Sequence, residues 1–113
     1  MLKNNNNNRI LAKEAKLCKN SFSKALGLMF SRKNKTLLFV FNKEKIISLH
    51  MFLVFYPIDV LFLNKNKKIV EIKQNFKPFT FHTPQNKAKY VIELPNGTVK
   101  RTKTEVGDTI RFK

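Results

Sequence analysis

The segment 46–63 constrains the fold of this chain more than any other stretch. It is nearly long and apolar enough for a helix that crosses a membrane, which needs roughly 20 mostly apolar residues, yet it contains His50, Pro57 and Asp59. A charged residue near the centre of such a helix costs about 2.5–3.5 kcal/mol on insertion scales, and proline removes a helical hydrogen bond. We therefore predict no membrane span. Two strands that meet at Tyr56-Pro57, in the core of a small β protein, accommodate these residues better.

The size of the chain allows one domain with a modest core. It has 113 residues, of which 42% are hydrophobic and eleven are phenylalanine, so we expect a folded protein. The single cysteine, Cys18, cannot form an internal disulfide, and residues 1–9 lack the apolar run of a secretory signal. Both features predict a location in the reducing cytoplasm.

The net charge of the chain is strongly positive. Twenty-three Lys and Arg residues against seven Asp and Glu residues give a formal net charge of +16. Such a charge attracts nucleic acids and other polyanions. However, lysines far outnumber arginines, and lysine is less suited to bidentate recognition of phosphate or guanine. A polyanionic partner and a general bias toward lysine and asparagine both remain open as explanations.

The N-terminal part of the chain is the most ambiguous in structure. Residues 1–8 are rich in asparagine, and we predict a disordered polar N-terminus that precedes a single β-rich domain over 9–113. Residues 9–18 fit a strand or a helix equally well. Residues 21–27 predict a short helix, because Ser21 is a favourable N-cap and Gly27 a favourable stop.

Short apolar runs separated by turn residues predict strands through the rest of the chain. The predicted strands are 36–41, two within 46–63, 68–73, 90–94 and 109–113. Turns are predicted at 42–45, 64–67, 95–97 and 106–108, a long loop at 75–87, and a helical turn capped by Thr98 at 98–103. This order predicts a mainly β fold with one or two short helices, in a small, compact, β-barrel-like single domain.

Four pieces of the sequence occur in an order that is typical of one family. They are Gly27-Leu28-Met29-Phe30, the run from His50-Met51 to Leu63, the run from Tyr90 to Thr98, and the run from Val106 to Phe112. Together they resemble the uncharacterised family named domain of unknown function 192, in its archaeal type. The commoner bacterial pattern has Trp-Met-Lys-Asn-Thr before the proline, where this chain has residues 50–54. The resemblance implies a compact β-rich, barrel-like domain and transfers no reaction.

Asp59 is the most conspicuous candidate for a functional side chain, because it lies among Ile58, Val60 and Leu61. A buried carboxylate needs hydrogen bonds or a cationic partner, or its pKa rises. One interpretation is a general acid or base at the edge of a pocket, together with His50 or His82. The other is a carboxylate that accepts backbone amides in the turn after Pro57, and we favour this second interpretation.

The segment 76–82 alternates aromatic and polar residues. Aromatic rings beside lysines can stack unpaired bases while the cations contact phosphates, although the same rings can also pack beneath the loop. We favour packing, and we keep a set of ligand-binding candidates from this segment and the preceding strands. The candidates are His50, Asp59, Phe76, Lys77, Phe79, Phe81 and His82.

The sequence contains no motif that specifies a reaction. The two histidines and Cys18 are scattered, without the paired spacing of a metal site, and there is no glycine-rich phosphate loop, so we predict no metal and no cofactor. We expect a non-catalytic binding module with an unknown ligand. The first alternative is a nucleic-acid-binding protein that uses the basic, phenylalanine-rich loop together with Lys73, Lys87 and Lys89. The second alternative is an enzyme with Asp59 and a histidine at a pocket.

Overall fold

The computed structural model describes residues 1–19, 36–47, 49–50, 56–78 and 80–112. The elements in this part are β1 (Leu2–Asn4), β2 (Ile10–Ala12), β3 (Lys16–Lys19), β4 (Leu37–Lys45), β5 (Leu49–His50), β6 (Ile58–Leu63), β7 (Ile69–Phe76), β8 (Phe81–His82), β9 (Ala88–Pro95), α2 (Thr98–Thr102) and β10 (Ile110–Arg111). The predicted mainly β class is therefore confirmed. The predicted helix at 21–27 lies outside the described residues.

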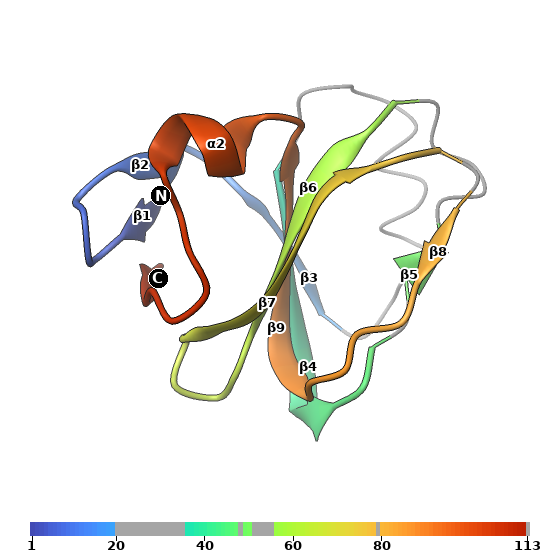
Figure 1. Cartoon of the computed structure of the whole chain (residues 1–113). Helices are drawn as coiled ribbons and strands as arrows, with labels where there is room; N and C mark the ends of the chain where they lie inside the picture. The colour runs from blue at the N-terminus through green and yellow to red at the C-terminus, as the bar shows by residue number, and fades with distance from the viewer. Residues whose placement is uncertain (20–35, 48, 51–55, 79, 113) are drawn as a thin grey trace.

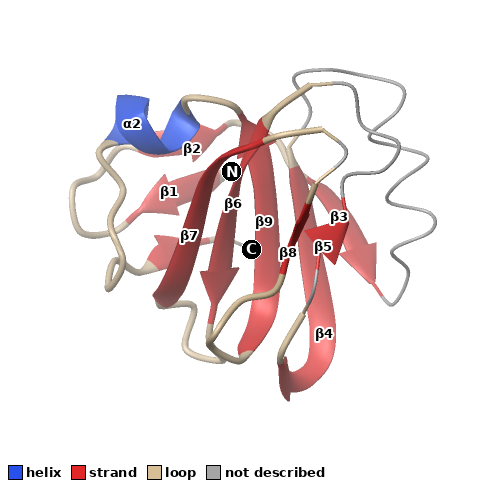
Figure 2. Ribbon diagram, turned by 45° about the vertical axis from the view of Figure 1, so that its right-hand side comes forward, coloured by secondary structure: helices blue, strands red, loops and turns tan. Residues whose placement is uncertain are grey.

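The strands are arranged in three sheets around a central layer. The central sheet has five strands in the order β3-β4-β9-β6-β7, a second sheet has the order β10-β1-β2, and β5 pairs with β8. Figure 1 shows the β10-β1-β2 sheet and α2 on one side of the central sheet and the β5-β8 pair on the other, and the turned view in Figure 2 agrees. The described sheets do not close into a barrel.

Strand β6 lies in the middle of the molecule, between β9 and β7. All six of its residues are buried, because both faces of the central sheet are covered. Leu61 and Leu63 belong to the core on the α2 side, whereas Ile58, Val60 and Phe62 belong to the core on the β5-β8 side. This two-sided burial explains the continuous apolar run that ends the segment 46–63.

Strands lie in both parts of the segment 46–63, as predicted. Strand β5 begins at Leu49 and β6 begins at Ile58, directly after Pro57. Residues 51–55 lie outside the described part. Among the described helices, none is long and apolar enough to cross a membrane.

Residues 1–8, predicted as a disordered polar tract, form β1 and a turn in the structure, and both are bonded to the C-terminal region. Asn4 is fully buried and donates through Nδ2 to Asp108 Oδ2 at 2.8 Å. The backbone N–H of Thr109 donates to Asn6 Oδ1 at 2.8 Å, and Asn7 Nδ2 donates to the carbonyl of Thr102 at 2.8 Å. An asparagine amide both donates and accepts, so a run of asparagines can bond to two strands at once. Residues 9–18, for which the sequence left strand and helix undecided, contain β2 and most of β3.

Two local predictions also differ from the structure. Residues 42–45, predicted as a turn, form the last part of β4. Strand β7 continues through Phe76, and residues 81–82 form β8, so the predicted loop 75–87 is shorter and contains a strand. Both differences extend strands through polar residues, where alternation of apolar residues gives no signal.

Candidate functional site

The side of the central sheet that faces β5-β8 carries most of the buried aromatic residues, and we call it the aromatic face. Its buried residues are Leu37, Phe39, Ile47, Ile58, Val60, Phe62, Phe76, Ala88 and Val91, with Phe41, Tyr56 and Val70 packed against them. Directly paired residues of neighbouring strands place their side chains on the same face. The strand register therefore adds two carboxylates to this face: Glu93, between Leu37 and Val60, and Glu71, opposite Phe62.

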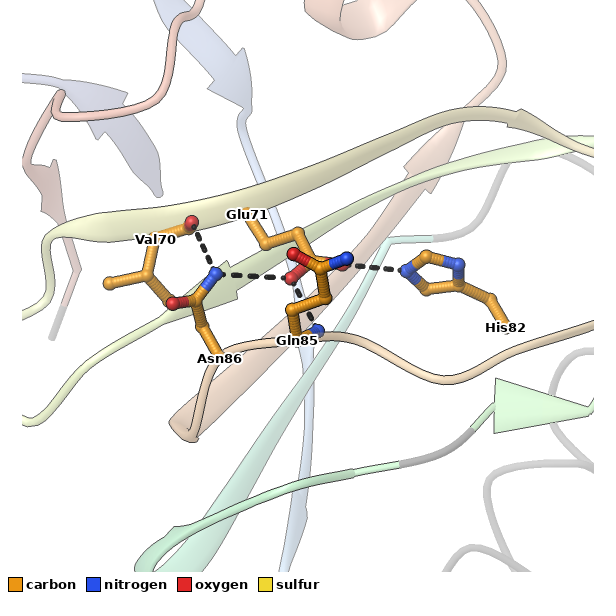
Figure 3. A network of polar contacts seen from close by, with 5 residues as sticks. All are labelled: Val70, Glu71, His82, Gln85 and Asn86. Carbon is orange, nitrogen blue, oxygen red and sulfur yellow. Dashed lines mark hydrogen bonds and ion pairs between the residues drawn. The ribbon is translucent and has the colours of Figure 1, made fainter.

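Glu71 fixes the chain that follows β8 to the central sheet (Figure 3). Its Oε2 lies 2.8 Å from His82 Nε2. Its Oε1 accepts from the backbone N–H of Gln85 at 2.9 Å and from Asn86 Nδ2 at 3.2 Å. Asn86 Nδ2 also lies 3.4 Å from the carbonyl oxygen of Val70. One carboxylate thus holds one residue of β8 and two residues of the β8–β9 connection.

The surroundings of this carboxylate favour its charged form. Partial burial raises the pKa of Glu71, but the hydrogen bonds from His82, Gln85 and Asn86 outweigh burial and hold the pKa below its ordinary value. The imidazole ring of His82 lies over aromatic residues, with its centroid 5.7 Å from that of Phe62. The contact between Glu71 and His82 is an ion pair whenever the imidazole is protonated.

Glu93 has the opposite environment on the same face. It is only 5% exposed, and its buried Oε2 has no hydrogen-bond partner among the residues that the structure describes. Its neighbours in the register are Leu37 and Val60, which offer no polar atoms from their side chains. Burial raises the pKa of Glu93 to about 8. At neutral pH this group is therefore mainly a neutral carboxylic acid.

The charged and titratable groups nearest to Glu93 do not compensate for its burial. The pKa of Tyr56 is raised, first by burial and then by the negative charge that Glu93 can carry. Lys73 and Lys16 stand in the same row of the register, each two strands away from Glu93, which corresponds to about 10 Å. No ion pair joins Glu93 to any described residue. Burial is the dominant effect on its pKa.

Asp59 lies on the other face of the sheet, and its partners are backbone amides. It is 1% exposed. Its Oδ2 accepts from the N–H groups of Val99 at 2.9 Å and Gly97 at 3.1 Å, and its Oδ1 accepts from the N–H of Asn75 at 3.0 Å. The amides therefore come from segments distant in sequence, and not from the turn after Pro57 as predicted.

The Asp59 carboxylate caps helix α2 from a neighbouring strand. Gly97 occupies the N-cap position with φ +91°, and the first turn contains no acidic residue and no side-chain cap of its own. Thr98, the predicted cap, instead donates its hydroxyl to the carbonyl of Pro95 at 2.7 Å. A carboxylate at a helix N-terminus satisfies free N–H groups and interacts favourably with their dipoles.

The predicted site residues are therefore not gathered in one place. Asp59 contacts α2 on one face of the central sheet, whereas His82 contacts Glu71 and Phe62 on the other. His50 belongs to β5, and its backbone pairs with that of Phe81, but its side chain lies outside what the structure describes. The combination of Asp59 and His82 at one pocket is not found.

The residues of the phenylalanine-rich segment also divide. Phe76 is 1% exposed and belongs to the core of the aromatic face, as the packing interpretation predicts. Phe81 is 69% exposed, and Lys77 is exposed as well. Phe79 lies outside the described residues. Only part of this segment is therefore presented at the surface.

Glu71 and Glu93 were not among the predicted site residues. They lie in the predicted strands 68–73 and 90–94, where neither was singled out. A signal for Glu93 was present, since it is a lone acid between Ile92 and Leu94. The same signal drew attention to Asp59.

A second group of polar residues surrounds an open cleft of about 400 Å³ beside the N-terminal turn. Its lining residues are Asn6, Asn7, Arg9, Lys103, Glu105 and Asp108. Several of these groups are already bonded, since Asp108 Oδ2 accepts from Asn4 and from the N–H of Glu105. Within the described part of the chain, no three His, Cys, Asp or Glu residues are grouped so that they could hold a metal ion.

The fold and these contacts define a small, mainly β protein with buried carboxylates on both faces of a five-stranded sheet. The chain belongs to the DUF192 family, described as "Uncharacterized ACR", whose family model matches residues 2–112. The resemblance found in the sequence is therefore confirmed, and it covers nearly the whole chain.

Similar archaeal proteins carry the name UPF0127 protein. The one from Pyrococcus furiosus is 37% identical over 101 residues, which cover 88% of this chain and 86% of the relative. The one from Pyrococcus horikoshii is 33% identical over 114 residues, which cover 99% of this chain and 98% of the relative. These relatives support the archaeal type that the sequence indicated.

Two solved structures share the fold. A crystal structure from Sinorhizobium meliloti, of a protein proposed to be a transcription regulator, has a TM-score of 0.77 and 27% identity, and covers 86% of this chain and 79% of that chain. A protein of unknown function from Novosphingobium aromaticivorans has a TM-score of 0.75 and 22% identity, covering 87% of this chain and 74% of that chain. The second similarity concerns the fold alone.

Proposed function

We propose that this protein is a non-catalytic binding module whose contact surface is the segment from Lys77 to Asn86, without residue 79, which we call the β8 loop. One observation supports this proposal most strongly. Glu71 anchors His82, Gln85 and Asn86 of the β8 loop to the central sheet, while Phe81 remains 69% exposed. A loop that is already ordered loses less conformational entropy on binding, and exposed aromatic rings are frequent contributors to binding energy.

Native mass spectrometry of the full chain tests this proposal. Wild-type protein is incubated with an extract of small molecules or of RNA from its native host. We expect it to retain a bound species whose mass equals that of the same species in the extract. The Phe81→Ala variant loses this species, because the exposed ring is removed. The Lys65→Ala variant retains it, since Lys65 is an exposed residue of the β6–β7 turn, outside the β8 loop.

The possible outcomes separate the parts of the proposal. Failure of the wild-type protein to retain any species from either extract contradicts binding by this module. Recovery of a chemically altered species contradicts the absence of catalysis. Equal retention by Phe81→Ala and wild type contradicts the assignment of the β8 loop as the contact surface.

Single-stranded nucleic acid is the second candidate ligand. Phe81 and Lys77 are both exposed and lie close together in the sequence of a chain of net charge +16. A base can stack on the ring while the cation contacts a phosphate. The name of the Sinorhizobium protein, proposed as a transcription regulator, adds support at 27% identity. Phe76 does not contribute to this surface, because it is buried.

Fluorescence anisotropy with a labelled oligouridine tests the second candidate. We expect binding at low salt that weakens steeply as salt is added, because phosphate contacts release counterions. Phe81→Ala weakens it about tenfold through loss of stacking, and Lys77→Ala reduces the salt dependence more than Lys65→Ala does. Absence of binding at low salt eliminates nucleic acid as the ligand. The proposal of a binding module is then tested by the native mass spectrometry alone.

A further inference from the structure

The open cleft beside the N-terminal turn is lined by charges of both signs that the fold does not pair. Arg9 and Lys103 contribute two cations, and Glu105 and Asp108 contribute two carboxylates. No ion pair joins any of these four groups to another described residue. The volume of the cleft, about 400 Å³, lies within the range that is usual for small-molecule sites.

Hydrogen bonds between the two ends of the chain hold the lining residues in place. Asn7 Nδ2 donates to the carbonyl of Thr102 at 2.8 Å and to that of Lys103 at 3.3 Å. The backbone N–H of Thr109 donates to Asn6 Oδ1 at 2.8 Å. A cleft whose lining is already ordered loses less conformational entropy when a ligand binds.

The charged groups of the cleft keep bonding capacity that the described structure does not use. Arg9 donates through Nη1 to the carbonyl of Arg101 at 3.3 Å, which occupies one of its five N–H groups. Asp108 accepts two hydrogen bonds through Oδ2, and its Oδ1 accepts none from a described residue. Both a donor fork and a carboxylate oxygen are therefore open to a ligand.

We propose that this cleft binds a small zwitterion, a molecule that carries one carboxylate and one ammonium group as a free amino acid does. The carboxylate of the ligand bonds to Arg9 and Lys103, because a guanidinium fork matches the two oxygens of a carboxylate. The ammonium group of the ligand bonds to Glu105 and to Asp108 Oδ1.

The mixture of charges favours a zwitterion over a simple ion. A simple anion that bonds to the two cations also faces the two carboxylates, and a simple cation meets the reverse arrangement. A zwitterion has a favourable partner for each of its charges. Because the net charge of +16 attracts any anion, preference for the zwitterion over a matched anion is the property that identifies this site.

The location of the cleft separates this inference from the β8 loop proposal. Its lining residues belong to the turn between β1 and β2 and to the connection between α2 and β10. These elements lie on one side of the central sheet, whereas β8 lies on the other (Figure 1). The inference therefore goes beyond the proposed function and concerns a second surface.

Glycine is the probe, because the six lining residues are all polar and glycine carries both charges without a side chain. Glycolate has a hydroxyl group in place of the ammonium group, and ethanolamine has an alcohol in place of the carboxylate. Each is titrated into the full chain at neutral pH and physiological salt, which screens the net charge. Chemical shifts of the backbone amides of Asn7, Lys103 and Glu105 report binding. We expect glycine to bind about fivefold more tightly than either control ligand, which is the effect of one exposed ion pair.

Two variants each remove one charge from the cleft. Glu105→Gln should weaken glycine binding about fivefold and should not weaken glycolate binding, because it removes a contact with the ammonium group alone. Arg9→Gln should weaken glycine and glycolate and should not weaken ethanolamine. Lys100→Gln and Glu14→Gln are the matched controls, since each removes an exposed charge outside the cleft. Amide spectra of the free variants establish that they are folded.

Three results overturn the proposal. The first is the absence of saturable shifts at the cleft amides when glycine is added to wild-type protein. The second is glycolate binding as tight as glycine binding, which indicates attraction of anions by the net charge. The third is a folded Glu105→Gln variant that binds glycine as tightly as Glu14→Gln does. None of these results bears on the β8 loop, which is tested by variants at Phe81 and Lys77.

Discussion

Asp59 and Glu93 lie on strands that are hydrogen-bonded neighbours, yet their carboxyl groups are in contrasting environments. Both are at least 95% buried. Asp59 faces α2 and accepts three backbone N–H groups. Glu93 faces the aromatic residues on the other side, and its Oε2 has no partner within the described structure. Burial alone therefore does not determine whether a buried acid stabilises the fold. The hydrogen-bond donors within its reach determine this.

The difference assigns the two acids to different roles. Asp59 joins β6 to the N-terminus of α2 and to the end of β7, so its contacts hold elements together. Glu93 Oε2, by contrast, accepts no hydrogen bond from any described residue. The first acid contributes to stability, whereas the second opposes it. This contrast can be tested by substitution at each position.

The largest effect is expected for Asp59→Ala. The substitution leaves the N–H groups of Asn75, Gly97 and Val99 without their acceptor in a buried site. We expect the free energy of unfolding to decrease by about 3–5 kcal/mol, because each lost bond involves a charged acceptor. Urea denaturation at neutral pH measures this change. A decrease below about 1 kcal/mol would contradict the structural role of Asp59.

The opposite sign is expected for Glu93→Leu. Replacing a buried, unpartnered acid with an apolar side chain should increase the free energy of unfolding by about 1–4 kcal/mol at pH 9. A folded variant that is less stable than wild type at pH 9 would indicate that Glu93 has a stabilising partner, and the contrast with Asp59 would then be wrong.

The stability of wild type should also depend on pH through Glu93. Its pKa is about 8 in the folded protein, against an ordinary value of 4.5, so the folded state holds the proton more tightly. The unfolding free energy should therefore decrease as pH rises from about 4.5 to about 8, by on the order of 1 kcal/mol for each pH unit, and change little above it. The Glu93→Gln variant lacks this decrease. Identical profiles for variant and wild type would show that burial does not shift this pKa.

The burial of Asp59 was predicted from the sequence, whereas that of Glu93 was not. The apolar run around Asp59 correctly indicated burial and a need for backbone amides. However, the donors Gly97 and Val99 are 38 and 40 residues away, and only the strand register brings them close. Glu93 was not identified, because its lack of partners depends on Leu37 and Val60, which lie on two other strands.

The N-terminal asparagines show the same dependence on distant partners. Composition indicated disorder, since a polar tract has no apolar face with which to pack. In the structure, the partners of Asn4 are Thr104 and Asp108, at separations of 100 and 104 residues. Local patterns thus predicted most strands, whereas side-chain hydrogen bonds between the ends of the chain could not be inferred from them.

A smaller effect is expected for Glu71→Gln, which tests a third carboxylate that has donors but lies partly in solvent. The variant loses the charged acceptor for His82 and Asn86, and we expect a decrease of about 1 kcal/mol in the free energy of unfolding. Because the pKa of Glu71 is lowered in the folded state, its contribution is present above the ordinary value of 4.5 and is lost as pH falls through the lowered pKa. Hydrogen exchange at the Gln85 N–H should accelerate in the variant at neutral pH. Unchanged exchange would show that Glu71 does not anchor the β8 loop.

An effect of similar size is expected for Gly97→Ala, which changes the backbone that Asp59 caps without removing the carboxylate. Gly97 has φ +91°, and a Cβ added there meets no atom within 4 Å, so the cost is conformational strain and not a clash. We expect a decrease of about 1 kcal/mol in the free energy of unfolding. Gly97→Asn should cost less, because asparagine tolerates positive φ better than alanine. If both variants are instead as unstable as Asp59→Ala, the N-cap conformation matters as much as the carboxylate, and the stability assigned to Asp59 belongs to the α2 turn as a whole.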